Sequence, residues 1–368
     1  MFLVPLEPSV TPSALFSRRL AKDAKLSEIL NKNKLNQNYQ RMHENAVCRT
    51  CTCTTKLFTQ PYCTGFANSV CDEMTCEPAS LLMRTLSGKA AALRLRAALR
   101  SSDTICGMDD SGRFYSNLAE LHSVQTAERA QYKLANEIWW ADGGYGGCST
   151  ESAMIGDEGS AADVLESVKY LDDMHARLSL PSLGLAVDAG AGAGRVTKHV
   201  LLPRCRDVVL VEADPCWSAL SQTYVGAAAE RCRFVQARLE ELTIGDLGLT
   251  NDSAGGTVDL VWVQWCLQYL TDADAIRSLC TLAQVLRAPH GVMLVKENRP
   301  FHAGPDPRLF RMSTPSGPKR RYNITRPDAH HRYLFQVAGL EVLDAMPAGE
   351  TCFWTLRKIS PASGPPAS

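Results

Sequence analysis

A glycine-rich turn after an apolar run is the feature that most constrains this chain. The segment reads Ala186-Val187-Asp188-Ala189-Gly190-Ala191-Gly192-Ala193-Gly194-Arg195, with glycine at every second position from Gly190. This pattern predicts a buried strand over 185–188, a tight turn and a helix over 195–202. Glycine has no Cβ, so a ligand can approach the backbone closely, and the first N–H groups of the helix point at that ligand. The turn therefore predicts a site for a nucleotide-like cofactor.

The glycine spacing alone does not identify the ligand. It differs from the G-x-G-x-x-G pattern of dinucleotide folds, and no Gly-Lys-Ser/Thr sequence of a P-loop follows. A tight turn with only a structural role remains the alternative. Glu212 ends the next predicted strand, 207–212, and an acid about twenty residues beyond such a turn commonly binds the two ribose hydroxyls. A solvent-exposed acid at a strand end is the alternative interpretation of Glu212.

Strands and helices alternate from residue 185 onward, which predicts a doubly wound, mostly parallel α/β sheet of seven strands. The ligand should lie beyond the carboxyl ends of the strands, where Asp188, Glu212 and Gln264 would converge. Strands are expected at 185–188, 207–212, 233–236, 258–264, 291–296, 341–345 and 352–358, and helices at 195–202, 215–226, 272–287 and 326–338.

Composition limits the classes of partner. Of 368 residues, 45% are hydrophobic, and 39 Lys and Arg balance 39 Asp and Glu. A neutral chain has no general attraction to nucleic acid or anionic membranes, and no apolar run approaches the ~20 residues of a membrane span. Most of the 14 cysteines are scattered, which favours a reducing compartment, the cytoplasm or nucleus. For the localisation, an organelle-targeting peptide over 1–20 is the alternative. For the clustered cysteines, a zinc site at Cys48 and Cys51 is the alternative to free thiols.

Periodicity predicts the domain organisation. Little regular patterning precedes residue 125, and six cysteines gather within 48–76. We therefore expect a cysteine-rich, partly disordered N-terminal extension over 1–125 and one α/β domain over 126–360. The tail 361–368 is rich in Pro, Ser and Gly and should be disordered.

Four sequence blocks together carry a family resemblance. The chain resembles the eukaryotic protein N-terminal (α-amino) methyltransferases, which use S-adenosylmethionine (AdoMet), over about 131–358. These enzymes methylate the α-amine of proteins that begin Xaa-Pro-Lys/Arg, and the resemblance implies the class I (Rossmann-like) methyltransferase fold. The blocks are Gly143-Gly144-Tyr145-Gly146, the glycine turn Asp188 to Lys198, Trp262-Val263-Gln264-Trp265 and Val295-Lys296-Glu297-Asn298.

The resemblance implies a set of residues around AdoMet. Arg195 should pair with the methionyl carboxylate, as its family counterpart does, and Glu212 should bind the ribose in place of the family's Asp. Leu239 and Glu240 should contact the adenine edge. The full cofactor set is Asp188, Gly190, Gly192, Arg195, Glu212, Leu239, Glu240 and Gln264, and methyl transfer requires no metal.

The resemblance also implies an aromatic channel for the acceptor. The substrate residues are Trp139, Trp140, Tyr145, Trp265, Asn298 and Arg326, and the catalytic residues are Asn298, Trp265 and Tyr269. Tyr269 stands where the family has His, and the segment 318–326 is basic where the family has acids, so a cation at the third substrate position should be repelled. A methyltransferase for another acceptor and a cofactor-binding relative without turnover are the alternatives. The expected partners are protein or peptide N-termini.

Overall fold

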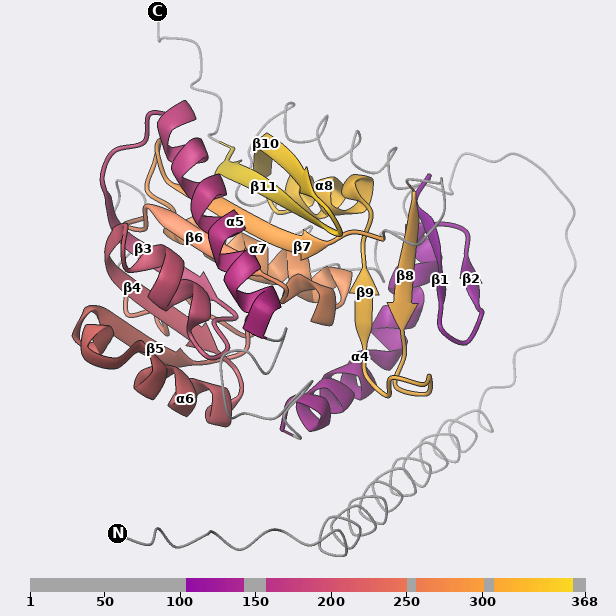
Figure 1. Ribbon diagram of the computed structural model, residues 1–368. Coiled ribbons are helices and arrows are strands. Elements are labelled where there is room, and N and C mark those ends of the chain that lie inside the picture. The colour runs from indigo at the N-terminus through magenta and orange to yellow at the C-terminus, as the bar shows by residue number, and fades with distance from the viewer. Residues whose placement is uncertain (1–103, 142–156, 250–255, 301–307, 360–368) are drawn as a thin grey trace, which may run out of the picture. The chain divides into compact units, whose positions relative to one another are not determined.

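A seven-stranded sheet forms the centre of the computed structural model, which describes residues 104–141, 157–249, 256–300 and 308–359 (Figure 1). Its strand order is β10-β11-β7-β6-β3-β4-β5. The five strands from β3 to β7 run parallel, whereas β11 pairs antiparallel with β7 and with β10. The strands are β3 (Leu183–Ala189), β4 (Cys205–Glu212), β5 (Cys232–Gln236), β6 (Leu260–Gln264), β7 (Val292–Asn298), β10 (Leu340–Ala348) and β11 (Thr351–Lys358).

Both faces of the sheet are covered, because successive strand residues point to opposite sides. Val187 and Val261 pack in a core with helices α4 (Leu118–Ala141), α7 (Asp272–Val285) and α8 (Asp328–Val337). Ala186 and Leu260 pack in a second core with α5 (Asp157–Arg177), η2 (Thr197–Leu201) and α6 (Pro215–Val225). Figure 1 shows α5 and α7 on opposite sides of the sheet. The expected doubly wound α/β architecture is confirmed.

The expected elements appear close to their predicted positions. Each of the seven strands is found, and the helices expected at 215–226, 272–287 and 326–338 are α6, α7 and α8. The helix expected at 195–202 starts with two α-helical residues and continues as a π-helical turn, η2. None of the helices among the described residues combines the length and apolarity needed to span a membrane.

A second, smaller sheet was not expected. It has the order β2-β1-β8-β9, with β1 (Cys106–Asp109) parallel to β8 (Leu309–Ser313). The other two strands are β2 (Phe114–Tyr115) and β9 (Asn323–Thr325). The expected boundary between residues 125 and 126 is wrong, because it falls inside α4, and Ile105 and Tyr115 are buried in the same core as the large sheet. The cysteine-rich segment 48–76, the segment 1–20 and the tail 361–368 lie outside the described residues.

A buried carboxylate joins several elements below α4. Asp272, the first residue of α7, is fully buried, and its Oδ1 accepts hydrogen bonds from Arg326 Nε and Nη2 at 2.9 and 2.8 Å. Its Oδ2 lies 2.9 Å from His122 Nε2 of α4 and 2.6 Å from His330 Nε2 of α8. Burial alone would raise the pKa of Asp272, but His330 and Arg326 hold it well below its ordinary range. Asp272 therefore ties α4, α7 and α8 together through hydrogen bonds to its carboxylate.

Glu297 is a second buried acid, on β7. Its Oε1 accepts the N–H of Leu267 at 2.7 Å, and its Oε2 has no hydrogen-bond partner among the described residues. Burial raises the pKa of Glu297 to about 8, against the opposing effects of the Leu267 N–H and the Arg326 cation. The side chain is therefore protonated at neutral pH.

Replacing this acid by an amide should flatten the pH dependence of stability. Because folding raises the pKa of Glu297 from 4.5 to about 8, its contribution is full below pH 4.5 and is lost as the pH rises through about 8. The free energy of unfolding, measured by urea titration at several pH values across this window, should fall more steeply for the parent than for Glu297→Gln. The exposed Glu230→Gln is the matched control. Parallel curves for the parent and Glu297→Gln would contradict this assignment.

Candidate AdoMet and acceptor site

The site lies at the carboxyl edge of the sheet, which we define as the side where β3 to β7 end. Neighbouring strands place Gln264 at the end of β6, Gly190 just after β3 and Glu212 at the end of β4. Leu239 follows β5, which pairs with β4 on the far side from β3. The order along this edge is therefore amide, glycine turn, acid and apolar side chain.

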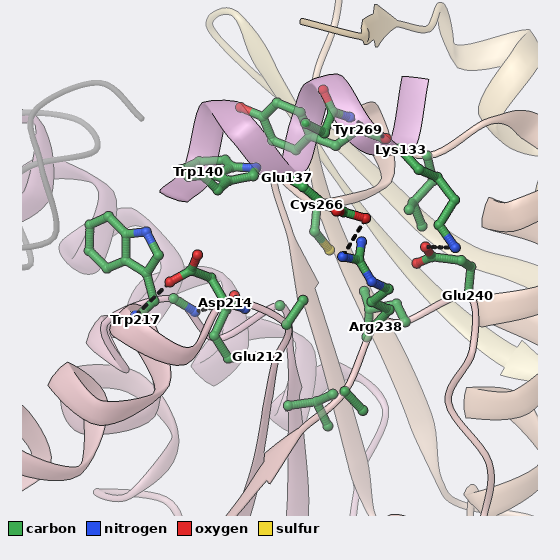
Figure 2. A pocket seen from close by; sticks show the side chains of 18 of the residues that line it. Lys133, Glu137, Trp140, Glu212, Asp214, Trp217, Arg238, Glu240, Cys266 and Tyr269 are labelled. Carbon is green, nitrogen blue, oxygen red and sulfur yellow. Dashed lines mark hydrogen bonds and ion pairs between the residues drawn. The ribbon is translucent and has the colours of Figure 1, made fainter. Parts of the chain in front are cut away.

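A pocket of about 380 Å³ opens at this edge, a size typical of sites for small molecules (Figure 2). One wall comes from the strand ends and the loops after them, and the other comes from α4. From the predicted set, the pocket is lined by Gly190, Gly192, Glu212, Leu239, Glu240, Gln264, Trp140, Trp265 and Tyr269. Asp188, Arg195, Trp139, Asn298 and Arg326 do not line it, and Tyr145 lies outside the described residues.

The glycine turn has a backbone that other residues would strain. Gly190, Gly192 and Gly194 have φ values of +80°, +54° and +82°. A Cβ on Gly190 would lie 2.8 Å from the Cβ of Cys266, which is closer than real Cβ contacts. The N–H groups of Gly190 and Ala191 both donate to the carbonyl oxygen of Val211, at 2.9 and 3.0 Å. The turn is thus pinned to β4, and its close approach to Cys266 requires glycine.

Glu212 connects the glycine turn to the loop after β4. Its Oε2 accepts the N–H of Gly192 at 2.8 Å, and its Oε1 accepts the N–H of Asp214 at 2.9 Å. Burial raises the pKa of this carboxyl, against the hydrogen bonds from Asp214 and Gly192. Each oxygen has further acceptor capacity beyond the one backbone bond. The acid is therefore held at the pocket with two fixed oxygens that can accept hydroxyl donors.

Asp188 is hydrogen-bonded within the protein, at the start of η2, and its contact with the cofactor stays a prediction. It is 2% exposed and lies outside the pocket lining. Its Oδ2 accepts from Thr197 N at 3.1 Å and from Thr197 Oγ1 at 2.6 Å. Burial raises its pKa to about 6, although Thr197 lowers it. The side chain of Asp188 therefore connects β3 to the first residue of η2, across the glycine turn.

Three ion pairs join α4 to the segment after β5. Lys133 Nζ lies 3.1 Å from Glu240 Oε1 and also contacts Glu241. One turn further along α4, Glu137 Oε1 lies 2.6 Å from Arg238 Nη2. Figure 2 shows Lys133 with Glu240, and Glu137 with Arg238, side by side at the pocket. The expected adenine-edge residues thus lie where α4 closes on the sheet.

The described part of the aromatic channel lies on the α4 side of the pocket. Trp140 makes edge-to-face contacts with Tyr269 and Trp217, with ring centroids 5.2 and 6.4 Å apart. Trp265 follows Gln264 directly and has a φ of +53°. Its backbone N–H donates to the carbonyl oxygen of Lys296 at 2.9 Å. This left-handed backbone turns the chain sharply at the end of β6 and places Trp265 in the pocket lining.

Three predicted acceptor residues have other surroundings. Arg326 is 1% exposed and, besides Asp272, donates to the carbonyl oxygens of Leu267 and Leu270 at 2.8 and 2.7 Å. Its contact with the substrate stays a prediction. Trp139 packs under the guanidinium of Arg321, 4.4 Å from ring centroid to Cζ. Asn298 Nδ2 donates to Gln268 Oε1 at 3.1 Å.

Sequence reasoning missed several residues of this region. Asn136 and Trp217 line the pocket, and Asp163 of α5 contacts both Arg195 and Gln264. No sequence motif marks Asp163, although it shares one buried helical face with Ser167, Tyr170 and Met174 in the structure. No cluster of three or more His, Cys, Asp and Glu side chains suited to a metal ion occurs among the described residues.

Comparison with known proteins agrees with this geometry. A 27% identical relative, alpha N-terminal protein methyltransferase 1 of Arabidopsis thaliana, aligns over 65% of this chain and 83% of its own length. A 35% identical Drosophila melanogaster protein of that name aligns over 41% and 51%. The mouse N-terminal Xaa-Pro-Lys N-methyltransferase 1 is 30% identical over 40% of this chain and 64% of its own. This chain thus spans only about half to two thirds of the latter two relatives.

A solved structure shows the same fold. It is a SAM-dependent methyltransferase from Leishmania major with a TM-score of 0.55 and 24% identity, and the match covers 69% of this chain and 96% of that one. The family model for AdoMet-dependent proline di-methyltransferases matches residues 132–348, which contain the whole described pocket. The chain therefore belongs to the AdoMet-dependent proline di-methyltransferase family.

Proposed function

We propose that this chain methylates the α-amine of a protein N-terminus that begins Xaa-Pro. The observation that carries the proposal is the continuity of the pocket, which runs from Glu212 and the glycine turn to the aromatic residues Trp265, Trp140 and Tyr269. The names of the relatives and of the family support the same reaction class. An aromatic wall beside the cofactor suits a flat, apolar proline ring at the second substrate position.

The residues of the pocket fit AdoMet. Gly190 leaves room for close approach where a Cβ would collide with Cys266, and Glu212 presents two fixed acceptor oxygens for a ribose diol. With the ribose at the end of β4, the adenine would lie toward Leu239 beyond β5. The amino-acid end would extend across the glycine turn toward Gln264 at the end of β6. The adenine, the ribose and the amino-acid end would thus follow the order of groups along the carboxyl edge.

When bound, AdoMet supplies a methyl group on a sulfonium, and this methyl moves to the amine nitrogen as its bond to sulfur breaks. An α-amine has a pKa of about 7.7–8.0, so a useful fraction is neutral near pH 7 without a strong base. The work of Trp265, Trp140 and Tyr269 is then to hold the amine in line and to exclude water, which is an effect of proximity and orientation. The proton that the methylated ammonium loses passes to solvent.

The charge near the aromatic residues supports a substrate preference. Arg321, in the basic segment 318–326, is 5% exposed, and its Cζ lies 4.4 Å from the Trp139 ring and 5.8 Å from the Tyr269 ring. A cationic third residue of the substrate would approach this guanidinium and be repelled. We therefore propose that Xaa-Pro defines the acceptor and that lysine at the third position is not required.

The first test is a peptide methylation assay with isotope-labelled AdoMet and the full chain. Peptides beginning Ala-Pro or Pro-Pro with a free amine should be methylated, and the same peptides with an acetylated N-terminus should not. Glutamine at the third position should react at least as fast as lysine, because it avoids the Arg321 cation. Labelling of the acetylated peptide would overturn the α-amine assignment, and labelling only of a non-peptide acceptor would favour a different substrate class.

A second test concerns the ribose acid. Glu212→Gln removes the charge and replaces one acceptor oxygen by an amide donor, so either Gly192 N–H or Asp214 N–H loses its partner. A hydrogen bond to a charged group contributes about 1.5–3 kcal/mol, so the affinity for AdoMet should fall roughly tenfold or more. Isothermal titration calorimetry measures this, with the exposed Glu230→Gln as control. An affinity within twofold of the parent would remove Glu212 from the cofactor site.

A third test separates acceptor from cofactor. Trp265→Ala should raise the KM for the peptide by roughly tenfold, the order expected for a buried aromatic contact, while the Kd for AdoMet stays within threefold. Trp265→Phe keeps an aromatic face toward Arg195 and Lys296 and should preserve most of the activity. Equal losses of peptide and AdoMet binding in Trp265→Ala would show that the indole only supports the pocket.

A further inference from the structure

A buried charged cluster lies beside the methionyl end of the proposed cofactor site. We call it the Asp163 cluster, and it consists of Asp163 on α5, Arg195 after the glycine turn, Gln264 at the end of β6 and Lys296 on β7. Three of these side chains come from the carboxyl edge of the sheet, and all three donate to the one carboxylate from the helix. The side chains are between 1% and 11% exposed.

The contacts converge on both oxygens of Asp163. Arg195 Nη1 donates to Oδ2, Lys296 Nζ lies 2.6 Å from Oδ1, and Gln264 Nε2 lies 3.0 Å from each oxygen. The Gln264 amide cannot rotate freely, because its Oε1 accepts the indole N–H of Trp262 at 3.0 Å. The carboxylate therefore sets the orientation of both the Arg195 guanidinium and the Gln264 amide.

The charges explain why a carboxylate is needed there. Two cations meet one buried anion, and the half-buried Glu166, with its Oε2 2.5 Å from Lys296 Nζ, completes the balance. Burial alone would raise the pKa of Asp163, but Arg195 and Lys296 hold it below its ordinary value. Without Asp163, the two cations would lose their shared partner in a desolvated place, where an uncompensated charge is costly.

The cluster adjoins the pocket without closing it. Gln264 and Trp265 line the pocket, and the Arg195 and Lys296 cations lie 5.8 and 5.7 Å from the Trp265 ring centroid. Asp163, Arg195 and Lys296 lie behind these two residues and are not among the lining residues. Its bond to Arg195 uses one of five guanidinium N–H donors, so the same arginine can also receive a ligand carboxylate.

We propose that Asp163 is a positioning residue for the amino-acid end of AdoMet. Its carboxylate binds Arg195 and Gln264 on the side away from the pocket. Their remaining donors and acceptors can then bind the methionyl group without a change of rotamer. This inference rests on the proposed placement of the cofactor, with its ribose at Glu212. It does not depend on which acceptor the enzyme methylates. Preorganised groups bind more tightly, because the cost of ordering them is already met in the free protein.

Two ligands that differ only in the amino-acid part provide the test. S-adenosylhomocysteine carries that part, whereas 5′-methylthioadenosine has the same nucleoside and thioether without it. Asp163→Asn keeps the shape of the side chain and removes the charge. The affinity for S-adenosylhomocysteine should fall by about tenfold or more, the loss expected for one charged hydrogen bond, and that for methylthioadenosine should change less than about twofold. Calorimetry or competition binding measures both.

The control variants separate positioning from folding. Asp173→Asn makes the same change at an exposed position of α5 and should leave both affinities unchanged. The double variant Asp163→Asn/Lys296→Met removes one charge of each sign and so keeps the net charge of the cluster. It replaces the single variant in the test if the single variant does not fold. We expect this double variant to show the same selective loss of S-adenosylhomocysteine affinity.

Two outcomes would overturn the proposal. An equal loss for both ligands, in the single or the double variant, would mean that the cluster only supports the fold. Unchanged affinity for S-adenosylhomocysteine would mean that Arg195 and Gln264 do not need the carboxylate. Because no peptide is used, a failure here is distinguishable from a failure of the proposed acceptor, which the peptide assay tests by itself.

Discussion

The site depends on the absence of a side chain at one position, Gly190. There β3 ends, the backbone turns with a positive φ, and Cys266 from the end of β6 approaches so closely that a Cβ would collide with it. This contact lets the neighbouring strands β3, β4 and β6 bring their ends to one place. The hydrogen bonds from the turn to Val211 and Glu212 then fix it against β4. A larger residue at position 190 would push the glycine turn away from the end of β6. The pocket residues on the turn and those after β6 would then move apart.

The opposite wall depends on charge and hydrogen bonding. Helix α4 carries Lys133, Asn136 and Trp140 to the pocket, and polar contacts attach it to α7 and to the short helix η4 (Leu267–Tyr269) before α7. His122 meets Asp272, Arg129 binds both oxygens of Asp274, and Asn136 Nδ2 donates to the carbonyl oxygen of Tyr269 at 2.9 Å. Because Asp272 and Asp274 are nearly fully buried, these pairs act where water screens little. The shape of the acceptor side thus follows from ionic contacts that no sequence motif reveals.

Much of the fold could be predicted because the central strands are apolar on both faces and separated by regular helices. The glycine turn and Glu212 were also readable, since both depend on local sequence. The second sheet was not, because β1 contains Gly107 and Asp109 and β9 has only three residues, so neither presents an apolar run. Asp188 and Arg326 lie in motif-like positions, but the tertiary structure buries them and bonds them to Thr197 and to Asp272. Asp163 lay in no motif, and only three-dimensional convergence of its partners identifies it.

The folded unit is larger than the segment that the family model matches. The family match starts within α4 and stops at the last residue of β10, so it omits β1, β2 and β11. Strand β11 lies between β10 and β7, and β1 pairs with β8. A fragment trimmed to the homologous region would expose unpaired backbone on β7, β8 and β10, and such open strands promote aggregation. Recombinant production of this enzyme therefore needs the chain from before Cys106 to beyond Lys358.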